Sequence, residues 1–434
     1  MTTPHDPSVR WTPVRKFAFR FFSIYCCLYM LYTWLRFGTI PGLKELHWFL
    51  WPAFNAVVRF FNDHLLHVRT ILVEPSSSTD TSFSWAAQYT MLIISIVVAF
   101  VWSTLDRKRS NYLTAEYWLR VAVRYFIAYF ALYYGIIKLF ALQMPFPSLS
   151  QLSTPLGDLS PTRLSWMFIG ASTSYQVFSG VIETMAGIFL INRRTVTLGA
   201  LLSTAVFGNV VALNFSYDIP VKLMSAHFFI LSGYLLLFES KRMIDFFLNK
   251  PTVSTNLYNV SFDKKWEKYG RIAAKVAFVY VSVVMVFILS INTYKSQHLV
   301  VDTAPIEQGV YDVKYFSLNG DSVLAGRDSI RWRDLVLYGV TGSIKTADTI
   351  FVQRYERGYF SFDVNAAGQT MIIRRNYGDM NKIATLRYEL PDSVTLRLSG
   401  TLRSDSLIVV LKKSNKRFAL SQPNQFHWLQ EASK

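Results

Sequence analysis

The sequence predicts an α-helical membrane bundle of about seven transmembrane helices, followed by an all-β antiparallel domain of about 135 residues at the C-terminus. Half of the 434 residues are hydrophobic, and 17% are charged, whereas soluble domains carry about a quarter charged residues. The apolar residues gather in stretches of about 18 to 25 residues, which is the length that crosses a bilayer core. Beyond Val310 the apolar period changes to two, as in strands.

Each apolar stretch predicts one span. The expected spans are 17–37, 85–105, 118–140, 166–191, 195–217, 221–238 and 272–291. The first stretch resembles a signal peptide in its charge order. We expect it to be retained, because it is long, carries Arg20 and Arg36, and has no small-residue cleavage site after it.

The basic residues predict the orientation. They lie in the N-terminal segment, in 107–109, at Arg193-Arg194 and in 241–271, whereas residues 141–164 contain only Arg163 and the turn between the fifth and sixth spans contains only Lys222. By the positive-inside rule, the N-terminus is cytoplasmic and the C-terminal domain extracytoplasmic, in a plasma (inner) membrane. The net charge of +17 follows from this pattern, and we do not expect nucleic acid as a partner.

Four regions follow along the chain. Residues 1–112 hold the first two spans and an outer amphipathic insertion at about 43–73, in which Trp48 and Trp51 are interface anchors. Residues 113–240 hold four spans, 241–298 hold a basic cytoplasmic loop and the seventh span, and 299–434 form a periplasmic-type β domain.

The β domain is predicted from short segments that alternate in polarity, and we expect a sandwich or a small barrel. The expected strands are 310–316, 350–355, 359–364, 370–374, 395–398 and 407–411. Turns are expected at 319–321, Arg357-Gly358, Ala367-Gly368 and Pro391-Asp392.

Polar residues inside spans are functional candidates, because burying them in lipid is costly. Glu183, His227 and Lys222 are the candidate catalytic residues, as acid, imidazole and cation. The candidate ligand-binding residues are Lys138, Tyr134, Asn209, Asn214 and Asp218. On one interpretation these residues form interhelical hydrogen bonds and interfacial contacts. On the other they form an outward-opening pocket that binds and protonates a polar ring such as a quinone.

Other chemistry finds little support. Cys26 and Cys27 are adjacent within the first span, so we expect neither a disulfide nor a cysteine-ligated cluster. His64 and His67 share a helix face but lack a third ligand, and no metal site is predicted. The sequence also lacks phosphate-loop, dinucleotide and nucleophile-elbow motifs.

Within the middle four spans the sequence resembles the DoxX-like membrane proteins. The resemblance rests on Tyr134-Gly-x-x-Lys138, on Ser179-Gly180-x-x-Glu183 with Gly187, on Arg193-Arg194-Thr195, and on the run from Asn209 to Leu223. The resemblance implies a four-helix core over 113–240. The founding member of the family is similar to a subunit of a thiosulfate:quinone oxidoreductase. A more distant resemblance is to the membrane part of vitamin K-dependent carboxylase-type proteins. The extra helices and the β domain depart from the family pattern and weaken any transfer of activity.

Three functions remain open. The first is an accessory or quinone-interacting subunit of a membrane redox system, with quinone as a possible cofactor although no cofactor is required by the sequence. The second is a non-catalytic scaffold whose β domain binds an envelope or periplasmic partner, with Trp332, Tyr338, Tyr355, Tyr359 and Trp428 as candidate anchors. The third is small-molecule transport.

Overall fold

A computed structural model of the chain describes residues 10–37, 44–75, 80–252, 260, 262–297, 306–322, 330–376 and 378–421. Two compact units are formed, one from Met1–Gln143 with Ser174–Thr293, the other from Met144–Thr173 with Tyr294–Lys434. The second unit is therefore built from two stretches of chain. The shorter stretch connects two helices of the first unit.

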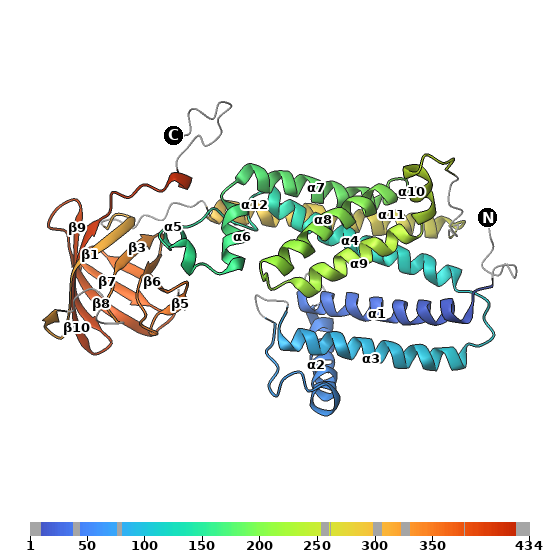
Figure 1. Cartoon of the computed structure of the whole chain (residues 1–434), viewed down its shortest axis with the longest axis horizontal. Coiled ribbons are helices and arrows are strands. Elements are labelled where there is room, and N and C mark those ends of the chain that lie inside the picture. The colour runs from blue at the N-terminus through green and yellow to red at the C-terminus, as the bar shows by residue number, and fades with distance from the viewer. Residues whose placement is uncertain are drawn as a thin grey trace. The chain divides into compact units, whose positions relative to one another are not determined.

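The first unit is helical (Figure 1). Its helices are α1 (Pro13–Phe37), α2 (Lys44–Phe61), α3 (Ser82–Leu105), α4 (Leu113–Leu139), α7 (Thr173–Ile191), α8 (Val196–Ser216), α9 (Lys222–Leu237), α10 (Ser240–Phe247), α11 (Lys265–Val279) and α12 (Val286–Gln297). Among the described residues, six helices are long and apolar enough to cross a membrane, with α11 to α12 counted as one. The pair α9 and α10, bent by 78°, makes a seventh if it is one span.

The expected fourth span, 166–191, was wrong at its start. Residues 166–170 belong to a separate helix, α6 (Pro161–Gly170), and α7 begins at Thr173. At the end of α6, a Cβ on Gly170 would lie 2.5 Å from the carbonyl oxygen of Pro145. This close backbone contact holds α6 in the second unit, so the apolar stretch is divided between the two units.

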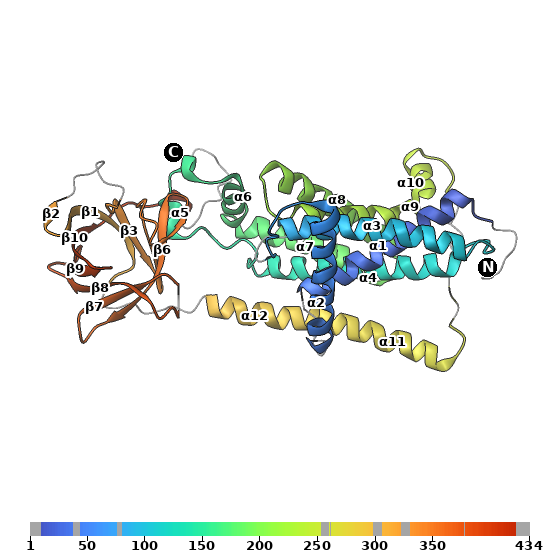
Figure 2. The ribbon, with the colours of Figure 1, turned by 90° about the horizontal axis from the view of Figure 1, so that it is seen from below.

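The expected insertion is confirmed as a helix. α2 continues into a short π-helical turn, η1 (Asn62–Leu66), and runs across α1 and α3 (Figure 2). Trp51 packs against Phe83 with ring centroids 5.8 Å apart, whereas Trp48 is 78% exposed. One face of α2 therefore meets the bundle while the other is free for an interfacial environment.

The last span is longer than expected. α11, a π-helical turn (η3, Tyr280–Met285) and α12 form a continuous helix of 33 residues. At 1.5 Å per residue it is about 50 Å long, which exceeds a hydrocarbon core of roughly 30 Å. Only 11% of its most apolar window is buried, so it lies at the edge of the bundle.

The β domain is a barrel, and the alternative of a sandwich is not found. Its strands are β1 (Gly309–Leu318), β2 (Asp321–Ser322), β3 (Asp334–Tyr338), β4 (Thr341–Ile344), β5 (Val352–Arg354), β6 (Arg357–Asn365), β7 (Thr370–Arg374), β8 (Lys382–Glu389), β9 (Thr395–Leu402) and β10 (Asp405–Lys413). The antiparallel order β10-β9-β8-β7-β6-β4-β3-β1 is closed by pairing of β1 with β10. Closure removes the free sheet edges.

Alternate residues along the strands point inward and form the barrel core. Leu396, Leu398 and Leu402 point inward from β9, and Leu407, Val409 and Leu411 do so from β10. The turn at Asn319-Gly320 is confirmed, with both residues at positive φ. The turn expected at Arg357-Gly358 was wrong, because these residues begin β6. The positive-φ turn residues are instead Tyr355 and Glu356.

Candidate functional site

Glu183 and Lys138 form an ion pair between α7 and α4. Both side chains are buried, and the second carboxylate oxygen of Glu183 has no hydrogen-bond partner among the described residues. Small residues allow this approach, as a Cβ on Gly180 would lie 2.8 Å from the Gly135 carbonyl oxygen. The helices thus meet backbone to backbone, which is the role expected for small residues in membrane helices.

His227 takes part in a different set of contacts, with α1 and α3. Its Nε2 is 2.5 Å from the hydroxyl of Tyr25, and that hydroxyl donates to Oε1 of Gln88 at 2.9 Å. The imidazole stacks on Tyr29 at 3.9 Å between ring centroids, and its Nδ1 is 2.6 Å from the Leu223 carbonyl oxygen. Both ring nitrogens are therefore occupied by protein atoms.

Lys222 and Asp218 lie at the turn between α8 and α9. Their side chains form an ion pair of 2.6 Å. The backbone N–H groups of Lys222 and Leu223 donate to the two carboxylate oxygens of Asp80, at 2.7 and 3.0 Å. Asp80 thus satisfies the free N–H groups that begin α9.

The remaining predicted ligand-binding residues are dispersed. Asn214 donates to the hydroxyl of Ser225 at 2.9 Å, and the hydroxyl of Tyr134 lies 3.9 Å from the sulfur of Met224. Asn209 is exposed on α8. The predicted residues therefore belong to separate contact groups, and among the described residues no hydrogen bond or ion pair joins any two of the catalytic candidates Glu183, His227 and Lys222.

The void beside Tyr29, the ring that stacks on His227, is small, whereas a pocket of about 600 Å³ lies one turn further along α9, where Ile230, Gly233 and Tyr234 line it. A void lined by Tyr29, Gln88, Leu223 and Met224 measures about 20 Å³, which is room for about one water molecule. It does not hold an aromatic ring. In the part of the chain that the structure describes, no three His, Cys, Asp or Glu side chains are arranged to hold a metal ion.

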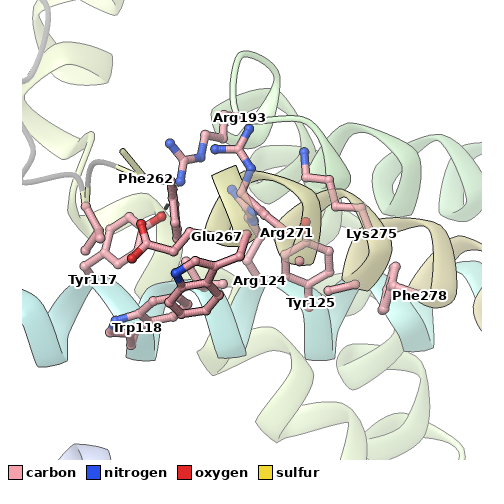
Figure 3. Close-up of a pocket in the computed structure, with 15 residues that line it drawn as sticks. Tyr117, Trp118, Arg124, Tyr125, Arg193, Phe262, Glu267, Arg271, Lys275 and Phe278 are labelled. Carbon is pink, nitrogen blue, oxygen red and sulfur yellow. Dashed lines mark hydrogen bonds between the residues drawn. The ribbon is translucent and has the colours of Figure 1, made fainter. Parts of the chain in front are cut away.

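A larger pocket, which the sequence did not predict, lies at the end of the bundle that carries the Arg193-Arg194 turn (Figure 3). Its volume is about 630 Å³, and it lies between α4, the α7–α8 turn and α11. Four cationic side chains line it together with one carboxylate, that of Glu267. The cations are Arg124, Arg193, Arg271 and Lys275. We call this the basic pocket.

The cations of the basic pocket are interleaved with aromatic rings. The Arg124 guanidinium carbon is 4.9 Å from the centroid of Tyr125, and that of Arg271 is 5.3 Å from Phe262. Arg193 donates to the hydroxyl of Tyr117. Arg124 is 8% exposed, and its Nε has no hydrogen-bond partner among the described residues.

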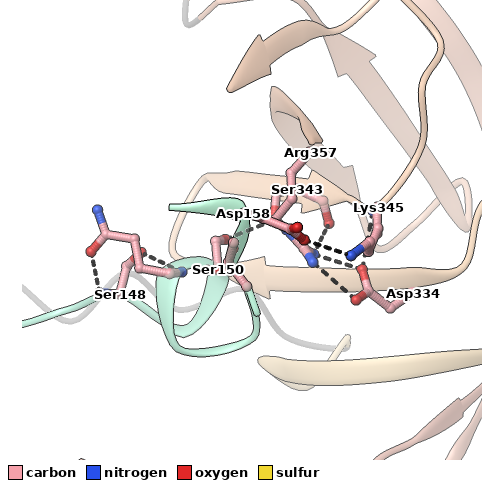
Figure 4. A network of polar contacts seen from close by, with 9 residues as sticks. Ser148, Ser150, Asp158, Asp334, Ser343, Lys345 and Arg357 are labelled. Atoms are coloured by element: carbon pink, nitrogen blue, oxygen red, sulfur yellow. Dashed lines mark hydrogen bonds and ion pairs between the residues drawn. The ribbon is translucent and has the colours of Figure 1, made fainter. Parts of the chain in front are cut away.

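A polar network joins the α4–α7 connection to the barrel (Figure 4). The connection contains α5 (Leu149–Leu152), η2 (Leu156–Asp158) and α6. The hydroxyl of Ser150, in α5, lies 2.8 Å from the hydroxyl of Ser343, in β4. Arg357 donates to the same Ser343 hydroxyl at 3.0 Å.

Two further contacts extend this network. Lys345 forms an ion pair of 3.0 Å with Asp158 of η2, and Arg163 of α6 donates to the hydroxyl of Tyr355 at 2.9 Å. Burial raises the pKa of Tyr359, and the Arg357 guanidinium opposes that rise. The connection therefore contacts the barrel from each of its three short helices or turns.

The network covers the outside of the barrel. Arg357 alternates along β6 with the core residues Gly358, Phe360 and Phe362, so it faces outward. It is nevertheless 1% exposed, and Ser343 is fully buried. The connection thus seals this outer face.

The candidate barrel anchors have different environments. Trp332 is fully buried in the core, whereas Tyr338 is 56% exposed. Tyr355 contacts Arg163, and Tyr359 is half-buried. Trp428 lies outside the described residues.

Part of the chain is similar to a known protein. A stretch of 88 residues is 30% identical to the uncharacterized protein YwoB of Bacillus subtilis (strain 168), which covers 20% of this chain and 57% of that protein. The chain thus spans just over half the length of this relative. No protein-family model matches the chain, and no solved structure matches it.

Proposed function

We propose that the protein is a non-catalytic membrane scaffold, in which the helical unit anchors the barrel and the barrel binds an extracytoplasmic partner. The observation that supports this most is the sealing of the barrel's outer face by the α4–α7 connection. A connection that served only to join two spans would not need buried hydrogen bonds and ion pairs to the barrel.

The covalent attachment supports the same proposal. The chain passes between the units at residues 143–144, 173–174 and 293–294. A domain on a single flexible tether samples a wide volume, whereas three attachments restrict it. Such a restraint suits a module that holds a partner near the membrane.

The hollows of the β unit suggest the chemistry of the partner. One of about 380 Å³ is lined by Arg331, Arg333 and Lys345 together with Glu356. Another of about 620 Å³ is lined by cations and apolar residues, and its cations are Lys413, Lys416 and Arg417. Cationic hollows complement an acidic envelope polymer or protein surface.

The function suggested by the resemblance to DoxX-like proteins, a quinone-interacting redox subunit, is the second candidate. Its support is the chain of contacts from His227 through Tyr25 to Gln88. The small void beside these residues counts against it. Transport is the third candidate, and nothing in the described structure favours it.

Photo-crosslinking in intact membranes separates these functions. A crosslinking residue at Gln353, which lines the first hollow, should give a discrete adduct that Arg333→Glu abolishes. The matched control is a crosslinking residue at Asn365, which is exposed on β6, the strand that pairs with the strand of Gln353. Absence of an adduct, with stoichiometric quinone that copurifies and is lost in His227→Ala, would reject the scaffold in favour of the redox subunit.

A further inference from the structure

The basic pocket belongs wholly to the helical unit, and its chemistry is independent of the barrel. We propose that it binds the phosphate headgroup of an anionic phospholipid, with the acyl chains leaving along the apolar side of the pocket. Nothing in the scaffold proposal is needed for this inference.

Charge supports a phosphate. Four cations face the pocket against the single carboxylate of Glu267. They come from three places in the chain, since Arg124 lies on α4, Arg193 on the α7–α8 turn, and Arg271 and Lys275 on α11. Like charges held together repel each other, so an anion between them lowers the electrostatic energy. Arginine also matches phosphate geometry with paired N–H donors.

Comparison with another buried arginine of the bundle shows which contact Arg124 lacks. Arg20, 4% exposed, donates to Ser103, to the Asp106 carbonyl and to the Tyr112 hydroxyl, and all three of its nitrogens are used. Arg124 is almost as buried, but its Nε has no hydrogen-bond partner among the described residues. A buried unpaired donor is costly, and a phosphate oxygen in the pocket would satisfy it.

The apolar lining supports an amphiphile. Val121, Tyr125, Ala274 and Phe278 line the same pocket, and of these Tyr125 and Phe278 follow the cations Arg124 and Lys275 along α4 and α11. Tyr125 and Phe278 meet edge to face at 4.8 Å between centroids. Both helices qualify as membrane spans, so this side of the pocket leads toward the hydrocarbon region, where acyl chains would lie. Basic pockets between membrane helices are known to hold anionic headgroups.

The position of α11 explains why the pocket exists. The helix extends past the length needed to span a bilayer, and its residues are mostly exposed. The pocket of about 630 Å³ lies between this helix and α4, and Lys275 is among its lining residues. A headgroup with part of its chains fits a volume of this size.

Native mass spectrometry of the full-length protein in mild detergent tests the proposal. The probes are phosphatidic acid, phosphatidylcholine and inorganic phosphate. We expect phosphatidic acid to be retained in preference to phosphatidylcholine. Arg124→Gln and Arg271→Gln should each weaken its binding about ten-fold, since charged hydrogen bonds are lost. Arg194→Gln is the matched control, because Arg194 neighbours Arg193 but does not line the pocket.

The Arg271→Gln variant and the choice of lipid give two separate tests of the lipid-binding proposal. Arg271 is exposed, so Arg271→Gln remains a valid test even if Arg124→Gln does not fold. Equal retention by wild type and Arg271→Gln, or equal retention of the two lipids, would overturn the proposal. Retention of inorganic phosphate without phosphatidic acid would overturn the lipid as ligand and assign the pocket to a soluble phosphate.

Discussion

Arg357 donates two hydrogen bonds to the carboxylate of Asp334, at 2.9 and 2.6 Å, on the outer face of the barrel beneath the α4–α7 connection. The paired geometry fixes β6 relative to β3, with β4 between them. Ser343 then links the same guanidinium to Ser150 of the connection. One buried arginine thus holds together the barrel wall and the segment that covers it.

Loss of this arginine should loosen the connection. Breaking a buried ion pair by removing one partner costs roughly 3–5 kcal/mol, and we expect Arg357→Leu to lower the free energy of unfolding of the β unit accordingly. Limited proteolysis should then cut within residues 144–173. The control is Arg397→Gln, which breaks a half-exposed pair with Glu389 and should leave the cleavage rate unchanged. An unchanged rate in Arg357→Leu would contradict the network.

The pair of Lys138 and Glu183 is predicted to be structural. Either Lys138→Met or Glu183→Gln alone leaves one side chain buried without its partner, and we expect a loss of about 3 kcal/mol in the free energy of unfolding. The double variant should recover most of that loss. A double-mutant cycle in detergent measures the recovery. Additive losses would show that the two residues do not stabilise each other, which would contradict the prediction.

Close contact of α4 and α7 gives a third prediction. A Cβ on Gly135 would lie 2.4 Å from the hydroxyl oxygen of Thr184 and 2.7 Å from its backbone nitrogen. Gly135→Ala should therefore destabilise the bundle by about 1–3 kcal/mol. Gly233→Ala is the matched control, because nothing lies within 4 Å of its Cβ position and alanine favours a helix. Equal thermal stability of the two variants would contradict the packing of α4 on α7.

The sequence predicted the positions of the helices better than the contacts between them. Long apolar stretches identify spans because a bilayer requires a fixed length. Glu183 is buried within α7, and His227 is partly buried within α9. Which residue each one meets depends on helix rotation, and that is set by contacts such as Gly180 against Gly135, which a single sequence does not show.

The basic pocket was missed for a related reason. Arg193 was read only as a topology signal, and Arg124 was not considered although it lies within the expected third span. The pocket arises because α11 leaves the bundle at its charged end, which spacing along one helix does not show. Two arginines, Arg120 and Arg124, at helical spacing inside a span were the signal available.

The barrel was predicted in outline. β7 (Thr370–Arg374) was located to the residue, the other expected strands were located with different ends, and β8 (Lys382–Glu389) was not expected. The short strands β3 and β4 were missed because their outward residues are also buried, as Val336 and Ser343 show. The α4–α7 connection covers them, so the alternation that marks a half-exposed strand is lost.

The central claim is that the α4–α7 connection is built onto the barrel. Ser150→Cys with Ser343→Cys, in a background where Cys26 and Cys27 are replaced by alanine, tests it directly, because the two hydroxyls are 2.8 Å apart and the thiols would be within disulfide reach. We expect rapid disulfide formation under mild oxidation, seen as a mobility shift after cleavage between the two positions. Ser150→Cys with Ser399→Cys, on β9, should not crosslink. Failure of the first pair to crosslink in folded protein, or equal crosslinking of both pairs, would contradict the claim.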